Sequence, residues 1–93
     1  MEIINESELH SFAKRHSNAR KPLANWINVT HAAAWKTFAD VRKTFRSADY
    51  VKELVVFDIG GNNFRLISSI DYTLQRVYVL EVMTHSEYDR WKA

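Results

Sequence analysis

The segment VFDIGGNNFRLI, residues 56–67, decides how the second half of this chain folds. Two runs rich in Val, Ile and Phe flank Gly60-Gly61-Asn62-Asn63, a composition typical of two strands joined by a tight turn. Both glycines of the protein lie in this turn, where a hairpin requires the positive φ that glycine adopts readily. A phosphate-binding glycine loop is excluded, because it joins a strand to a helix and carries more glycines at fixed spacing.

Strand patterns continue on both sides of this turn. Residues 54–59, 64–72 and 76–84 are rich in Val, Ile, Tyr and Phe, and residues 73–75 separate the last two runs. We therefore expect three strands in an antiparallel meander. Because successive side chains of a strand alternate between faces, Arg65 is expected on the face opposite to Phe64 and Leu66.

The first half of the chain has the period of helices instead. Asn5 followed by Glu8 predicts the capped start of a first helix of about ten residues, behind a short strand or extended lead over residues 2–4. Apolar residues between 19 and 27 predict a second helix, and Thr37 with Asp40 predicts a third, shorter one. The large aromatic residues are expected in the core: Trp26, Trp35, Phe38, Phe45, Phe57 and Phe64.

This order of elements predicts an α+β fold, with the helices on one face of the sheet and the other face open. A length of 93 residues predicts a single domain, residues 1–93. The absence of cysteine excludes a disulfide scaffold, a thiolate zinc site and a cysteine nucleophile. No signal peptide or membrane-spanning run is recognisable, so we expect a cytoplasmic protein.

Charge is distributed unevenly along the chain. Residues 14–46 contain eight basic residues and one acid, whereas residues 53–93 contain four basic and six acidic residues. A basic layer of this kind fits a protein that binds a polyanion, since neutralised phosphates release condensed counterions. Solvated helix faces would give the same charge pattern, and charge alone does not separate the two interpretations.

The segment THSEYDR, residues 84–90, is the chemically richest part of the chain. Thr84 or Ser86 can cap a short C-terminal helix, in which His85, Tyr88 and Asp89 would share one side. Histidine suits proton transfer near neutral pH, and a neighbouring carboxylate fixes its tautomer. A surface capping arrangement is the competing interpretation. No metal-ligand spacing is present, and the remaining histidines are expected to be surface or packing residues: His10, His16 and His31.

Three segments together closely resemble the HigB family of RelE-like toxins of bacterial type II toxin–antitoxin systems: residues 56–67, RVYVLEV at 76–82 and MTHSEYD at 83–89. The resemblance spans nearly the whole chain. It implies N-terminal helices packed on one face of a curved antiparallel sheet. It also implies an endoribonuclease without metal or cofactor that cleaves mRNA on the translating ribosome. A HigA-type helix-turn-helix antitoxin would hold it inactive, in a complex that could be a heterotetramer.

The resemblance also implies roles for individual residues. Arg65 matches the arginine of the family's NxxRL stretch, and His85, Tyr88 and Asp89 match its THxEYD stretch. The implied roles are a general acid or base for His85, a phosphate clamp for Arg65, a hydrogen-bonding or stacking group for Tyr88, and an orienting group for Asp89. Asp89 could equally cap the helix or pair with Arg65. The implied contacts to ribosomal RNA are Lys36, Arg42, Lys43, Arg46 and Arg90. The alternative function is a basic module that binds RNA or protein without catalysis.

Overall fold

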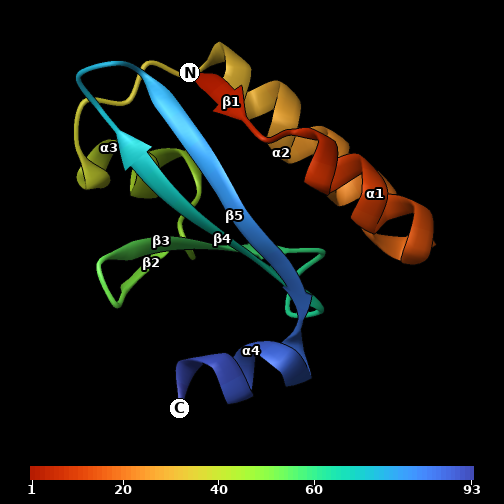
Figure 1. The fold of residues 1–93 in the computed structure, drawn as a ribbon. Coiled ribbons are helices and arrows are strands. Elements are labelled where there is room, and N and C mark those ends of the chain that lie inside the picture. The colour runs from red at the N-terminus through yellow and green to blue at the C-terminus, as the bar shows by residue number, and fades with distance from the viewer.

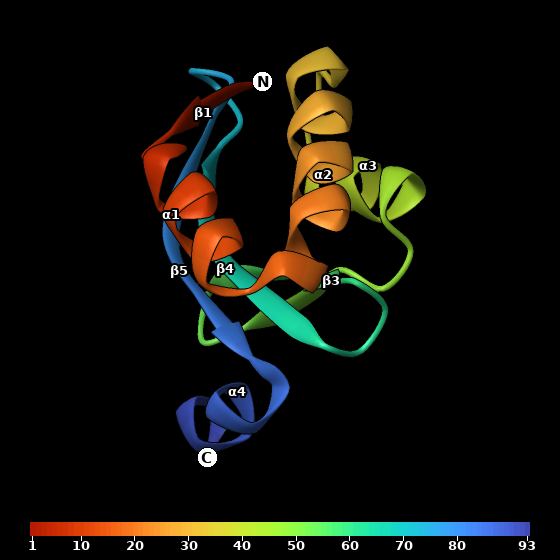
Figure 2. The same cartoon turned by 90° about the vertical axis from the view of Figure 1, so that its right-hand side faces the viewer.

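Five strands form one mixed sheet in the order β1-β5-β4-β3-β2, with helices on both of its faces (Figures 1 and 2). This computed structural model describes all residues from Met1 to Ala93. The elements in chain order are β1 (Glu2–Ile4), α1 (Ser7–Arg15), the 3-10 turn η1 (Ser17–Ala19), α2 (Arg20–Ala32), α3 (Phe38–Thr44), β2 (Asp49–Val51), β3 (Leu54–Ile59), β4 (Phe64–Asp71), β5 (Arg76–Thr84) and α4 (His85–Lys92). None of these helices combines the length and apolarity that crossing a bilayer requires.

The predicted α+β fold and the β3-β4-β5 meander are confirmed, but the sheet is larger and is not purely antiparallel. β1 pairs with β5 in parallel, with Ile3 opposite Val77. β2 adds a further antiparallel strand at the opposite edge, next to β3. β1 coincides with the short strand or extended lead predicted over residues 2–4, whereas the three-residue β2 is too short to display a strand period in the sequence.

The turn between β2 and β3 explains why this hairpin is invisible in the sequence. Its central residues Lys52 and Glu53 have φ of 53° and 65°, the left-handed backbone that hairpin turns usually assign to Asn or Gly. The next turn follows the usual rule, since Gly60 and Gly61 have φ of 64° and 68°, as predicted. Residues that do not favour a positive φ therefore make the first of the two turns.

Two of the three predicted helix caps are confirmed and one is wrong. The Thr37 side chain accepts a hydrogen bond from the Asp40 amide, and Thr84 forms a reciprocal capping box with Glu87. Asn5 does not cap α1. It has a φ of 70° where the chain turns from β1 into α1, and its side-chain amide donates to the Val79 carbonyl oxygen over 3.2 Å. The tight turn thus uses Asn5 to hold β5, and α1 begins at Ser7 without a side-chain cap.

The hydrophobic interior has two parts, one on each face of the sheet. The larger core packs α1, α2 and α3 against the sheet and contains Trp26, Trp35, Phe57 and Phe64, while Phe38 and Phe45 are partly buried against it. The smaller cluster lies on the opposite face, where Tyr88 of α4 contacts Val56, Ile67 and Met83. The expectation of an open second face is therefore wrong, because α4 folds back over it.

The strained β2–β3 turn generates a stability prediction. We expect Glu53→Gly to raise the free energy of unfolding by about 0.5–1 kcal/mol, because glycine removes the left-handed penalty at a cost in unfolded-state entropy. Urea unfolding measures the change. Glu53→Ala is the control and should give no gain, since alanine meets the same penalty. An equal gain in both variants would contradict this explanation.

Candidate active site

Arg65 is a buried cation at the centre of a polar cluster, with its side chain 9% exposed. Its Nε atom lies 3.1 Å from Asp58 Oδ1, and its Nη1 donates to the Phe64 carbonyl oxygen over 3.0 Å. Its Nη2 donates to Asn62 Oδ1. A buried guanidinium is tolerated only when paired and hydrogen-bonded, and here the β3–β4 hairpin itself supplies these acceptors.

The same guanidinium reaches the C-terminal helix. Its Nη2 lies 3.2 Å from His85 Nδ1, and its central carbon lies 5.4 Å from the centre of the Tyr88 ring. The expectation that Arg65 stands on an open face is therefore wrong, because α4 covers it. The structure does bring together the four predicted site residues from β4 and α4: Arg65, His85, Tyr88 and Asp89.

These contacts select one tautomer of the neutral His85 ring. A guanidinium can only donate hydrogen bonds, so His85 Nδ1 accepts from Arg65 and carries no proton. The proton of the neutral imidazole is then on Nε2, which lies 3.3 Å from Asp89 Oδ2. The contacts run in the order carboxylate, guanidinium, imidazole, carboxylate, and the guanidinium of Arg65 is the most buried of the four groups. Both ring nitrogens of His85 are engaged in this resting arrangement.

Tyr88 closes the buried side of the cluster. Tyr88 is 6% exposed. Burial raises the pKa of its phenol, and the charge of Asp49 raises this pKa further. The phenol is therefore protonated at neutral pH and offers a hydrogen-bond donor and an aromatic face. It does not offer a phenolate base.

Helix α4 is held at both ends, and this positions His85. At its start, the His85 amide donates to the Asn63 carbonyl oxygen over 3.0 Å, next to the Thr84–Glu87 capping box. At its end, Lys52 Nζ donates to the Trp91 carbonyl oxygen over 2.6 Å and lies 4.7 Å from the centre of the Trp91 ring. The two hairpin turns thus place the C-terminal helix.

Asp58 and Asn62 are residues of the cluster that sequence reasoning did not select. Asp58 lies directly opposite Arg65 in the β3–β4 ladder, and opposite charges at such positions commonly pair. The predicted hairpin with its turn at residues 60–63 already implied this register. Counting across the turn would have found Asp58, and Asn62 follows as a polar turn residue beside it.

The predicted RNA-contacting residues fall into two groups. Arg90 is exposed on α4, near the cluster. The others are exposed on α3 or next to its ends: Lys36, Arg42, Lys43 and Arg46. Because α3 packs on the sheet face opposite to α4, these two groups do not form one continuous surface on a single face.

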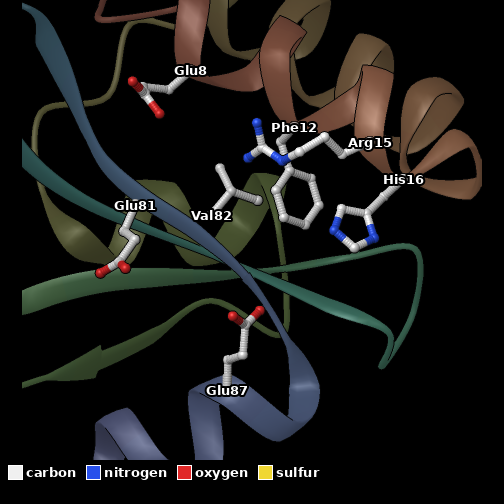
Figure 3. Close-up of a pocket in the computed structure, with 7 residues that line it drawn as sticks. All are labelled: Glu8, Phe12, Arg15, His16, Glu81, Val82 and Glu87. Carbon is white, nitrogen blue, oxygen red and sulfur yellow. The ribbon is translucent and has the colours of Figure 1, made fainter.

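A pocket of about 310 Å³ lies away from this cluster, between α1, β5 and the start of α4 (Figure 3). It contains three carboxylates, of Glu8, Glu81 and Glu87, and one guanidinium, of Arg15. Its His16 ring stacks on Phe12 with the ring centres 4.3 Å apart, so His16 is a packing residue, as expected. An excess of carboxylates disfavours a phosphate, and none of the predicted catalytic residues lines this pocket.

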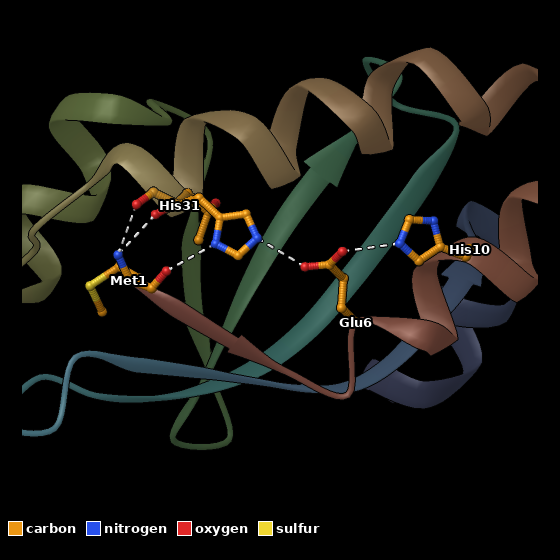
Figure 4. A network of polar contacts seen from close by, with 5 residues as sticks. Met1, Glu6, His10 and His31 are labelled. Atoms are coloured by element: carbon orange, nitrogen blue, oxygen red, sulfur yellow. Dashed lines mark hydrogen bonds and ion pairs between the residues drawn. The ribbon is translucent and has the colours of Figure 1, made fainter.

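The remaining histidines belong to a structural network (Figure 4). The Glu6 carboxylate contacts His10 Nε2 and His31 Nε2, each over 3.0 Å, and the hydrogen bond from His10 lowers the pKa of this carboxyl, aided by His31. The Met1 amine donates to the carbonyl oxygen of Ala33 over 2.6 Å, beyond the end of α2. These contacts join β1, α1 and α2. The structure shows no group of three or more side chains arranged to hold a metal ion.

Comparison with known proteins shows which family the chain resembles. The family model of the HigB toxin, described as the RelE-like toxic component of a toxin–antitoxin system, matches residues 19–91. The chain is similar to the mRNA interferase toxin HigB of Escherichia coli (strain K12), with 29% identity over 96 residues that cover 100% of this chain and 92% of the relative. It is equally similar to the mRNA interferase HigB of Shigella flexneri, with the same identity and coverage.

The matched region contains the whole polar cluster, from Asp58 and Arg65 in the β3–β4 hairpin to Asp89 in α4. The chain therefore belongs to the HigB family of RelE-like toxins of toxin–antitoxin systems.

Proposed function

We propose that the protein is an endoribonuclease that cleaves mRNA and so inhibits translation and growth until an antitoxin neutralises it. The observation that carries this proposal is the contact of Arg65 with His85, which is itself in contact with Asp89. This arrangement places a cation that can bind a phosphate next to an imidazole that can transfer a proton. The names of the relatives, mRNA interferases, support the same reaction.

The chemistry of RNA cleavage gives each residue a task. A 2′-hydroxyl must lose its proton, the phosphate must be stabilised as charge builds up, and the leaving 5′-oxygen must gain a proton. His85 is the proton-transfer group, and Asp89 orients its ring. Arg65 stabilises the phosphate, and the protonated Tyr88 phenol contributes a hydrogen bond or a stacking face. The residues need no metal ion for this reaction.

The resting contacts suggest how substrate activates the site. Arg65 has five N–H donors, and its contacts to Asp58, Phe64 and Asn62 anchor it in the hairpin. A substrate phosphate that accepts the Nη2 hydrogen bond would replace His85 in that contact. The lone pair of His85 Nδ1 is then released to take a proton. The binding of the phosphate to Arg65 and the release of His85 as a base therefore occur in the same step.

Further elements of the proposal concern partners. We propose a HigA-type helix-turn-helix antitoxin that could form a heterotetramer with the toxin, and action in the cytoplasm on mRNA held by the ribosome. Placing a strand of mRNA accurately against His85 would supply the orientation that the site does not impose by itself. In this view Arg90 and the basic residues around α3 contact ribosomal RNA.

Loss of His85 should abolish the activity without unfolding the protein. We expect His85→Ala to lower the rate of mRNA cleavage by about 10²–10⁴-fold, the usual contribution of general acid–base catalysis. Induced expression in a bacterial host, followed by growth and by primer extension on an abundant translated mRNA, measures the effect. His10→Ala is the matched control, since His10 is exposed and outside the cluster, and it should still arrest growth.

Three outcomes of this experiment are informative. Persistent cuts in His85→Ala would move the catalysis to another residue. Growth arrest without any cuts in the unchanged protein would contradict the nuclease. Soluble unchanged protein with neither arrest nor cuts would favour the non-catalytic binding module.

The contact with Arg65 predicts the tautomer of His85. The ¹⁵N chemical shifts of the neutral ring should show a proton on Nε2 and none on Nδ1, because Arg65 occupies the Nδ1 lone pair. A 2′-O-methyl dinucleotide, which cannot be cleaved, should then shift the Nδ1 resonance as its phosphate displaces His85 from Arg65. A proton on Nδ1 in the free protein would overturn the proposed activation.

The basic residues on α3 or next to its ends, here called the α3 cations, should contribute to ribosome binding through charge: Lys36, Arg42, Lys43 and Arg46. We expect the double variant Lys43→Glu/Arg46→Glu to bind ribosomes more weakly and with a shallower dependence on salt, since fewer counterions are released. Lys14→Glu/Arg20→Glu makes the same charge change at exposed positions away from α3 and is the control. An unchanged salt slope in the α3 variant would refute these contacts.

A further inference from the structure

Tyr50 is exposed although it is a large aromatic side chain. It is 57% exposed, more than Leu74 at 55% or Leu80 at 50%. It lies in β2, at the edge of the sheet, and its ring centre is 5.8 Å from that of Phe38 in α3. Nothing in the proposed cleavage reaction uses this ring.

Tyr50 belongs to a group of three aromatic side chains, Phe38, Tyr50 and Tyr72, which we call the aromatic patch. Phe38 and Tyr72 are partly buried and pack against the large core, so they form a firm base. The pKa of the Tyr72 phenol is raised, first by burial and then by the phenol of Tyr50, which places the two phenols within electrostatic reach of each other. The patch thus offers one exposed ring on a rigid support.

Basic residues lie on and next to α3, the helix that carries Phe38 of the aromatic patch. The acid of α3, Asp40, accepts a hydrogen bond from the Lys36 amide over 2.9 Å and lies 4.0 Å from Lys43 Nζ, and Asp49 accepts a hydrogen bond from the Tyr50 amide over 2.8 Å. Arg42 donates to the carbonyl oxygen of Arg46 over 3.0 Å, and no carboxylate lies within ion-pair distance of either guanidinium. Positive charge therefore remains available at the surface of α3, beside the exposed ring.

The aromatic patch and the candidate active site lie on opposite faces of the sheet, with Tyr50 in the edge strand β2 and Arg65 two strands inward in β4. Along β2, Tyr50 points toward α3, whereas Val51 packs against the small cluster beneath α4. The charge of Asp49 raises the pKa of Tyr88, which places Asp49 on the α4 side as well. β2 has no further strand beyond it. A flexible chain can therefore pass round this edge from one face to the other.

We propose that Tyr50 is a stacking site for an unpaired base of RNA, and that the α3 cations hold the phosphates that flank this base. An exposed ring on an aromatic support, accompanied by basic residues, is the combination by which proteins bind single strands without sequence preference. This inference rests on the proposed function and adds a second contact, outside the catalytic cluster. Phe38 is a positioning residue that supports the Tyr50 ring from below.

The stacking is tested by comparing two proteins, the natural sequence and Tyr50→Ala, in their binding of two oligomers. The probe is a fluorescein-labelled 12-nucleotide 2′-O-methyl RNA, which cannot be cut, and an abasic 12-mer with the same phosphates is its counterpart. We expect Tyr50→Ala to weaken binding of the base-containing oligomer by roughly 5- to 150-fold, the range for loss of one stacked base. Binding of the abasic oligomer should not change. Fluorescence anisotropy measures both affinities for the full chain.

Control variants separate stacking from charge and from folding. Tyr50→Trp should retain binding, and Leu74→Ala and Leu80→Ala, at similarly exposed positions, should bind like the natural sequence. Tyr50→Ala should keep the natural salt slope and melting temperature, whereas Lys43→Gln should lower the slope. Equal losses for both oligomers, or no loss for either, would overturn the inference. The mRNA cleavage assay is a separate measurement. If the binding assay contradicts stacking on Tyr50 while mRNA is still cleaved, the proposed nuclease activity stands and only the stacking site is refuted.

Discussion

The ion pair between Arg65 and Asp58 is the constraint on which the rest of the site depends. A buried guanidinium that loses its partner commonly destabilises a protein by about 3–5 kcal/mol, so the β3–β4 hairpin must present acceptors at defined positions. The two glycines with positive φ set the register that places Asp58 opposite Arg65. The turn also places Asn62 beside the guanidinium. Once Arg65 is fixed, α4 completes its surroundings with His85 and the Tyr88 ring.

The sequence predicts those parts of this arrangement that depend on local signals. The bounds of β3 and β5, the capping of α3 and α4, and the large aromatic core all follow from composition and spacing between near neighbours. The parallel pairing of β1 with β5 depends instead on residues more than seventy positions apart. The β2–β3 turn uses Lys52 and Glu53 in a conformation that neither residue type favours. No local pattern encodes either feature.

The site shows the same division between local and long-range information. The spacing of His85, Tyr88 and Asp89 on one side of a helix can be read directly from the chain, and the structure brings them together with Arg65. The burial of Arg65 could not be read in this way, because it results from α4 folding back over the sheet. In that packing Tyr88 contacts Val56, Ile67 and Met83, and the Lys52 amine contacts the last turn of α4. The prediction of an open face was wrong because the sequence of an eight-residue helix does not indicate which surface the helix packs against.

The burial of Arg65 has a consequence for the timing of catalysis. In the resting arrangement the Nδ1 atom of His85 is engaged by Arg65, and its Nε2 atom faces Asp89. A bound phosphate removes the first restraint only if it reaches the Nη2 of a guanidinium that is 9% exposed. A freely moving RNA strand rarely adopts that position, whereas a strand held in place adopts it at little further entropic cost. The proposed stacking of one base on Tyr50, across the edge of β2, would hold a strand in this manner. Arg65 then has two functions: it occupies His85 Nδ1 in the resting site, and it releases that nitrogen when a correctly placed phosphate binds the guanidinium.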